Sequence, residues 1–146
     1  MTDTREQREL DRAHGRFRST VTDLEMLAPP AGPAPEPPRA GVRVARWESP
    51  DVDAYLALFR RIGEPWLWYG RLVQSRDAVA ALLHSPQHAV WRLFDGDAVA
   101  GLCELDRAQP GTVEIAYFGL VPECIGGGGG GYFMRTMLRE AWRGPV

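Results

Sequence analysis

Hydrophobic residues recur with two different periods along the chain, and these periods predict its strands and helices. Over residues 41–47 apolar and polar positions alternate, which is typical of a β-strand. After Ser49, which we expect to cap a helix with Pro50 at its first position, the apolar residues follow a helical spacing. Gly63 marks the expected end of this helix. Its apolar stripe is formed by Val52, Tyr55, Leu56, Phe59 and Ile62.

A second helix and a series of strands are predicted further along the chain. Ser75 is the expected cap of the helix. Its apolar face is formed by Ala78, Val79, Leu82 and Leu83. Residues 89–94 and 98–106 flank an Asp-Gly turn at residues 95–97, and Asp-Gly supplies the positive φ angles of a tight hairpin. Residues 112–121 are predicted as the longest strand.

Six consecutive glycines, residues 126–131, separate the last predicted strand from a predicted helix over residues 132–142. The helix has one apolar face, formed by Phe133, Met134, Met137, Leu138 and Ala141. Glycines that lead from a strand into a helix leave backbone N–H groups uncovered at the positive end of the helix dipole, which suits a phosphate. A glycine run is also typical of a flexible linker. Because this run is short and lies between two apolar elements, we favour the phosphate-binding turn.

The first forty residues differ in composition from the rest. Residues 1–18 are strongly charged and lack an apolar face, and residues 28–40 are rich in proline and alanine. Residues 21–27 alternate apolar and polar side chains and predict a short strand or a docking segment. We therefore expect an N-terminal extension over residues 1–40, with a proline-rich spacer, and one domain over residues 41–146.

Charge and cysteine content exclude several classes of protein. A net charge of −2 gives no basic surface of the kind that nucleic-acid binding requires. No apolar run approaches the length of a membrane span, and the N-terminus lacks the apolar core of a signal peptide, so we expect a cytoplasmic protein without membrane contact. Cys103 and Cys124 do not have the spacing of a zinc site, and we expect no metal.

Residues 120–131 resemble the acyl-CoA signature of the GNAT superfamily of N-acyltransferases. In that signature a Gln or Arg is followed by two free positions, a Gly, one free position, and a Gly or Ala. Gly128 and Gly130 match the two small positions, whereas Ile125 stands where the Gln or Arg is usual. The resemblance extends from about residue 41 to the C-terminus, because the predicted order of strands and helices is similar to that of the family's core.

The resemblance implies a fold and an activity. The fold is α/β (α+β), GNAT-like, with a mixed, mostly antiparallel sheet flanked by helices. The activity is transfer of an acetyl or other acyl group from acetyl-CoA to a primary amine of unspecified identity. GNAT domains continue with further strands and a helix after the glycine turn, so we expect a truncated member with an open strand edge. Such an edge would allow a dimer, and the alternative is a non-catalytic protein that binds a partner chain or, weakly, CoA.

The same resemblance implies which groups would hold acetyl-CoA. The backbone of Phe118, Gly119 and Leu120 would pair with the pantetheine arm, and a main-chain N–H near Leu120 would polarise the thioester carbonyl. The pyrophosphate would be held by the N–H groups of Gly126, Gly127, Gly128, Gly129, Gly130 and Gly131.

Two carboxylates are the candidates for removing a proton from the amine. Glu104 and Glu114 each share a side of a predicted strand with apolar residues, and a carboxyl group buried there has a raised pKa and can accept a proton. Glu114 is the first candidate because its strand leads to the glycine turn, and Glu104 is the second. The alternative for both is a solvent-facing position near a strand end.

An aromatic segment over residues 64–70 is the candidate acceptor site. It contains Trp66, Trp68 and Tyr69. These side chains would be either ordinary hydrophobic core or, as the resemblance implies for the segment near the first two helices, one wall of the pocket that binds the amine.

Overall fold

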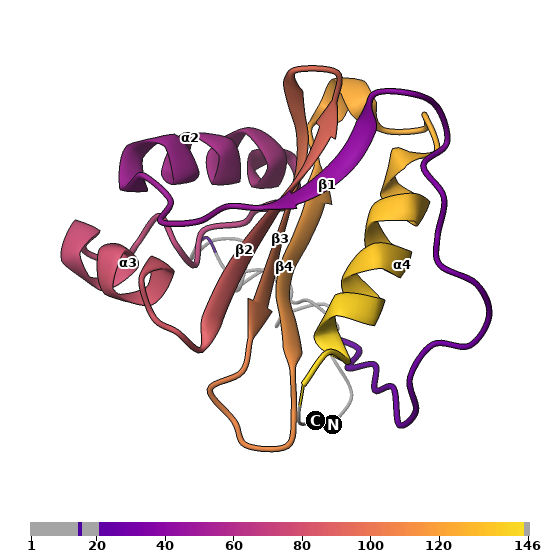
Figure 1. Ribbon diagram of the computed structural model, residues 1–146. Coiled ribbons are helices and arrows are strands. Elements are labelled where there is room, and N and C mark those ends of the chain that lie inside the picture. The colour runs from indigo at the N-terminus through magenta and orange to yellow at the C-terminus, as the bar shows by residue number, and fades with distance from the viewer. Residues whose placement is uncertain (1–14, 16–20, 145–146) are drawn as a thin grey trace, which may run out of the picture.

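The computed structural model describes residue 15 and residues 21–144 of the chain. In this part of the chain, four antiparallel strands form one sheet in the order β1-β2-β3-β4, and helices cover both of its faces (Figure 1). Helices α2 (Val52–Gly63) and α3 (Arg76–Leu83) lie on one face, and α4 (Gly129–Ala141) lies on the other. The expected α+β class is therefore confirmed. The expectation for residues 1–18 falls, except for Gly15, outside the described residues.

The strands are β1 (Val42–Arg46), β2 (His88–Asp95), β3 (Ala98–Asp106) and β4 (Glu114–Leu120). The hairpin between β2 and β3 is confirmed, and Gly96 at its turn has a φ of 61°. The expectation that the last strand is the longest is wrong, since β4 has 7 residues and β3 has 9. Thr112 instead closes the turn before β4, where its N–H donates to Gln109 O at 3.2 Å.

A bulge in β4 decides which of its side chains face which layer. Leu105 pairs with Ile115 and Glu104 pairs with Tyr117, so Ala116 is an extra residue on β4. Beyond the bulge, Tyr117 packs with the α2 and α3 side, whereas Phe118 packs with the α4 side. The bulge therefore sets the orientation of the half of β4 that leads to the glycines.

The helix caps agree with the sequence at one helix and differ at the other. Ser75 caps α3 as expected, because its hydroxyl oxygen accepts from the N–H of Ala78 at 3.2 Å. The expected cap of α2 at Ser49 is wrong. Asp51 is the last extended residue before the helix, and its carboxylate accepts from the N–H of Ala54 at 2.9 Å.

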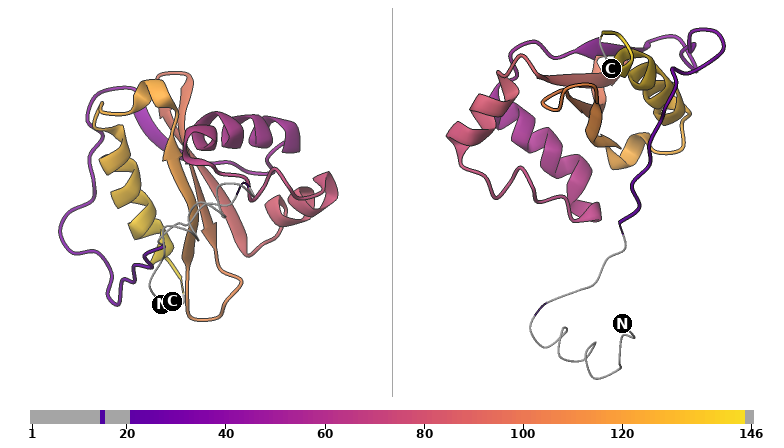
Figure 2. Two further views of the ribbon diagram at one scale, coloured as in Figure 1. Left: turned by 180° about the vertical axis from the view of Figure 1, so that it is seen from behind. Right: turned by 90° about the horizontal axis from the view of Figure 1, so that it is seen from below.

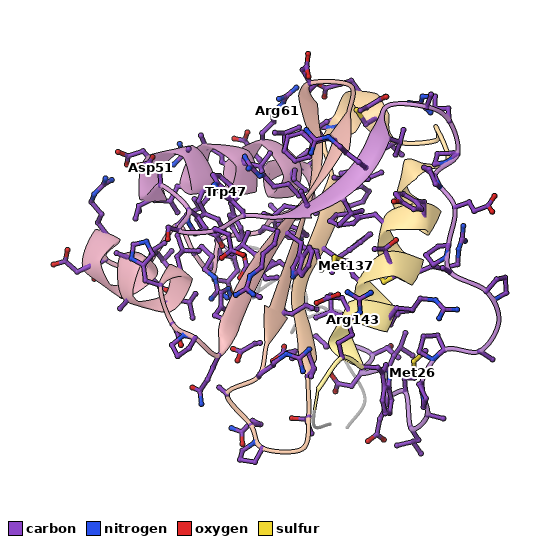
Figure 3. All side chains as sticks on the ribbon, viewed as in Figure 1. Met26, Trp47, Asp51, Arg61, Met137 and Arg143 are labelled. Atoms are coloured by element: carbon purple, nitrogen blue, oxygen red, sulfur yellow. The ribbon has the colours of Figure 1, made fainter. Side chains whose placement is uncertain are left out.

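The sheet separates two hydrophobic clusters. On the α2 and α3 side the buried residues include Tyr55, Phe59, Ile62, Val79, Val90 and Leu102. On the α4 side they include Leu93, Cys103, Leu105, Phe133 and Met137. Figure 3 shows Met137 between α4 and the sheet. The predicted stripes of α2 and α4 therefore face the sheet, although Leu56, Met134 and Leu138 are only half-buried. The predicted face of α3 is confirmed at Val79 and Leu83, which are buried, but not at Ala78, which is exposed.

The proline-rich segment over residues 28–40 is more than the spacer that we expected, because it runs along the outer side of α4 (Figures 1 and 2). Arg139 of α4 donates to the carbonyls of Gly32 at 2.5 Å and Pro33 at 2.6 Å. Arg39 donates to the carbonyl of Gly127 at 3.1 Å. Residues 21–27, in contrast, form no strand and are exposed.

Candidate functional site

The candidate site lies at the C-terminal end of β4. This strand is the last in the sheet and pairs only with β3 among the described residues, so its outer edge is open. Beside it is a mainly apolar cleft of about 420 Å³. The cleft is lined by Trp66, Trp68, Phe118, Gly119, Leu120 and Ile125. Residues predicted for the cofactor and residues predicted for the acceptor thus meet in one cleft.

Two glycines allow Trp68 to reach β4. The N–H of Trp68 donates to the carbonyl of Gly63, the last residue of α2, at 3.0 Å. A Cβ atom at Gly119 would lie 3.0 Å from Cη2 of Trp68, and one at Gly63 would collide with the Trp68 side chain. The indole packs against Tyr117, with ring centroids 5.0 Å apart. Trp68 therefore belongs both to the core and to the wall of the cleft.

The other two aromatic residues of this segment lie in solvent. Trp66 is 66% exposed and is one of the residues that line the cleft. Tyr69 is 65% exposed and does not line it. Between the two tryptophans, Leu67 has a φ of 58°, which is unusual for a bulky residue. This left-handed residue ends the short 3-10 turn Glu64–Trp66, after which Trp68 turns inward.

The glycine run forms a turn and the first turn of α4. Gly126 has a φ of 91° and Gly128 a φ of 80°, and the helix begins at Gly129 rather than at the expected residue 132. In residues 21–144 no backbone carbonyl accepts from the N–H groups of residues 126–131. The first such bond is from Tyr132 N–H to Gly128 O at 3.4 Å. Backbone N–H groups without intrahelical partners therefore lie at the positive end of the α4 dipole, next to Ile125 of the cleft.

The N-terminal segment adds a positive charge to this turn. Arg39 donates to Gly127 O and also forms an ion pair with Asp95 at the end of β2. A Cβ atom at Gly128 would lie 3.4 Å from Cβ of Pro38. Arg39 thus brings a guanidinium group close to the glycine turn. Sequence reasoning missed it, because nothing in the sequence connects residues 88 positions apart.

Glu104 lies in a closed polar cluster on the α2 and α3 side of the sheet. Its side chain is fully buried. The Tyr55 hydroxyl donates to Oε1, and Nη2 and Nε of Arg71 donate to Oε2 at 2.8 and 3.3 Å. Nε2 of His88 lies 3.1 Å from the same oxygen. Both carboxylate oxygens of Glu104 therefore have partners, and neither faces the cleft lining.

The expectation of a raised pKa at Glu104 is wrong. Burial alone raises the pKa, but the close contact with His88, the charge of Arg71 and the hydrogen bonds from Tyr55 and Arg71 together lower it below its usual value. The carboxylate is therefore stably ionised and is a weak proton acceptor. The sequence pattern revealed its burial but not its partners, which come from α2, the loop before α3 and β2.

Glu114 occupies the solvent-facing position that we considered as the alternative. It is the exposed first residue of β4 and pairs with Asp106 of β3. The cleft lies at the other end of the same strand. Burial in an apolar environment, which was the reason for choosing Glu114 as a base, is therefore absent.

Comparisons with known proteins add no assignment to this geometry. No protein-family model matches the chain, and no curated protein is significantly similar to it. In the described part of the chain, no three His, Cys, Asp or Glu side chains are grouped as metal ligands would be. None of the helices described is both long and apolar enough to cross a membrane.

Proposed function

We propose that this chain binds an acyl-CoA at the open end of β4 and transfers the acyl group to a primary amine. The observation that carries the proposal is the cleft beside β4, because it joins an open strand edge, exposed aromatic side chains and Ile125, which precedes the glycine turn. The pantetheine arm, which is extended and contains amides, would pair with the strand edge. An apolar acceptor would contact the aromatic side chains, and the diphosphate would bind at the glycine turn after Ile125. The GNAT resemblance of residues 120–131 supports the same ligand.

The backbone would perform most of the binding. The amides of the pantetheine arm would pair with the free edge of β4 at Phe118, Gly119 and Leu120, as an added strand does. The diphosphate would accept from the N–H groups of residues 126–131 at the positive end of α4. Arg39, close to Gly127, would contribute a positive charge to the same site.

In the transfer step, the amine nitrogen forms an amide bond with the acyl carbon, the carbon–sulfur bond breaks, and CoA leaves as the thiol. The amine must first lose a proton. Glu104 is ionised but engaged with Arg71 and Tyr55, so we assign it the role of a positioning residue. Arg71 lies over the ring of Tyr117 at 5.0 Å, and Tyr117 packs against Trp68 of the cleft. The acceptor would then react as the free amine, so the rate should rise with pH up to the pKa of the amine.

A second candidate function is non-catalytic binding of another chain through the same edge. It is favoured by exposed apolar side chains, of which Trp66 and Ile125 line the cleft and Leu67 follows Trp66 directly in the chain. An extended segment of a partner, or the same edge of a second copy, would then pair with β4. Sedimentation of the purified chain with and without acetyl-CoA separates the two functions, because a ligand in the cleft would displace the partner.

The test of the proposed function is a pair of matched glycine variants. Gly128 and Gly111 have nearly the same φ, 80° and 77°, so alanine should strain both to a similar extent. Only Gly128 belongs to the proposed diphosphate site. We expect acetyl-CoA to bind wild type and Gly111→Ala with equal affinity in calorimetry, and Gly128→Ala about tenfold or more weakly. Release of CoA thiol in the presence of a panel of primary amines then measures transfer.

Absence of binding heat at millimolar acetyl-CoA in the wild type would refute the proposal. Equal weakening by both alanine variants would also contradict it, because the effect would then come from strain rather than from the position of the turn. Binding without thiol release for every amine would leave binding as the function and remove the transferase activity.

A further inference from the structure

Two arginine guanidinium groups lie over one aromatic ring on the face of the sheet that α2 and α3 cover. Arg43 of β1 is the direct cross-strand neighbour of Phe94, and its guanidinium carbon lies 4.0 Å from the centroid of the Phe94 ring. Arg92, two residues before Phe94 on β2, lies 5.0 Å from the same ring and 4.1 Å from that of Trp47. Figure 3 shows Trp47 on the α2 side of the sheet.

These two charges have no carboxylate partner among the described residues. The ion pairs of that region use other arginines, such as Arg46 with Glu48 at 3.4 Å. Nε of Arg92 is buried and has no hydrogen-bond acceptor in the described part of the chain. Burial first, and the positive charge of Arg43 second, lower the pKa of Arg92. Arg43 is exposed and Arg92 is half-buried, and two like charges held close together are unfavourable unless an anion lies between them.

The strand register places these residues side by side on one face of the sheet. Ala45 is the cross-strand partner of Arg92, and Arg43 and Trp47 stand two residues before and after it on the same face. Ala45 contributes only a methyl group between three large side chains. The guanidinium carbons lie 4.0 to 5.0 Å from the ring centroids, a distance typical of cation–π contacts, and a guanidinium in such a contact keeps N–H donors that can bind an acceptor.

We propose that Arg43 and Arg92 form a binding site for a phosphomonoester group. Such a group carries a charge of about −1.5 to −2 at pH 7 and can accept from two guanidinium forks at once. It would accept from the terminal N–H groups of the two guanidinium groups and neutralise both charges. The site is independent of the acyl-CoA proposal, because β1 and β4 are opposite edges of the sheet.

The experiment uses the full chain and inorganic phosphate as the probe, with sodium chloride of equal ionic strength as the reference. We expect saturable binding in calorimetry and a shift of the Arg92 guanidinium resonances, because the terminal N–H groups of Arg92 gain an acceptor. Arg43→Gln and Arg92→Gln should each weaken phosphate binding about tenfold or more. Arg60→Gln, an exposed arginine on α2 away from the ring pair, should leave binding unchanged.

Further measurements distinguish a ligand site from arginine–aromatic contacts that only stabilise the fold. If the stack exists only to cover the rings, phosphate produces no saturable heat and no shift at Arg92, and the proposal is overturned. It is also overturned if Arg60→Gln weakens binding as much as Arg43→Gln. Arg43→Lys keeps the charge and the aliphatic stem but loses the planar fork, so it should fold like the wild type and still bind phosphate more weakly. Acetyl-CoA binding to Arg43→Gln should be unchanged, which keeps this test separate from that of the proposed function.

Discussion

The cluster around Glu104 and the glycine end of β4 differ in whether their polar groups have hydrogen-bond partners. At Glu104 every carboxylate oxygen has a partner and the side chain is fully buried. At the glycine end, the N–H groups of residues 126–131 have no backbone acceptor in the described part of the chain, and neighbouring Ile125 and Trp66 are 57% and 66% exposed. In the first region the charge of Glu104 is balanced by Arg71 within the protein, whereas in the second the N–H groups lack a backbone acceptor among the described residues.

This difference shows why burial of a charged residue alone is a poor guide to catalysis. A carboxylate in a sheet can be ionised by its partners, and it then holds neighbouring groups in place instead of exchanging protons. Unpaired backbone donors next to an apolar cleft are the better indication of a ligand site, because binding satisfies groups that the fold leaves without partners. The predictions below test this contrast.

The largest effect is expected from Glu104→Gln. The substitution preserves size but leaves the guanidinium of Arg71 without its counter-charge in a buried place, so the free energy of unfolding should fall by about 3–5 kcal/mol. Chemical denaturation measures the change. The matched control is Glu114→Gln, an exposed position where we expect a change within about 0.5 kcal/mol. Comparable losses in the two variants would show that the cluster is not a closed, stabilising unit.

The next effect is the response of the same cluster to acid. The pKa of Glu104 is lower in the folded than in the unfolded chain, so the unfolded chain binds more protons and stability falls as pH falls. The contribution should be fully present above the ordinary glutamate pKa of about 4.3 and be lost as pH drops through the folded-state value. The difference in denaturation midpoint between wild type and Glu104→Gln should therefore become smaller as the pH falls below the ordinary glutamate pKa. A constant difference over this range would mean that another group carries the effect.

A substitution beside the open end of β4 should have the smallest effect on stability but a clear effect on binding. Trp66→Ala removes an exposed side chain, so the free energy of unfolding should change by about 0.5 kcal/mol or less. Because Trp66 lines the cleft, binding of acetyl-CoA or of the amine should weaken by about 1 kcal/mol, or about fivefold. Tyr69→Ala is the control, since Tyr69 is equally exposed but outside the cleft lining. If the two variants bind equally well, the cleft is not the site.

Much of the fold could be predicted from local patterns. The Asp-Gly hairpin, the cap at Ser75 and the buried stripe of α2 depend on neighbouring residues, and all three are confirmed. The cap of α2 and the beginning of α4 were misplaced by two and three residues. In both cases the local signal, a serine before a proline or a run of glycines, does not by itself fix the last non-helical residue.

The candidate site could be predicted only in part. The sequence identified the residues of β4 and the two tryptophans separately, but Tyr69 and Glu114 fall outside the cleft lining. It did not identify Arg39 at the glycine turn, or Arg43 and Arg92 over Phe94. These groups come together through strand pairing and through the N-terminal segment that runs along α4, and neither produces a local sequence pattern.

The sequence by itself therefore determined the elements of this protein and the backbone properties of its glycine turn, because hydrophobic period and glycine conformation act over a few residues. Only the tertiary structure decided which charges are neutralised and which remain available. That outcome depends on partners supplied by distant parts of the chain: Tyr55 and Arg71 neutralise Glu104, while Arg43 and Arg92 remain without a carboxylate among the described residues. A charge acquires its role from these neighbours, which only the folded chain brings together.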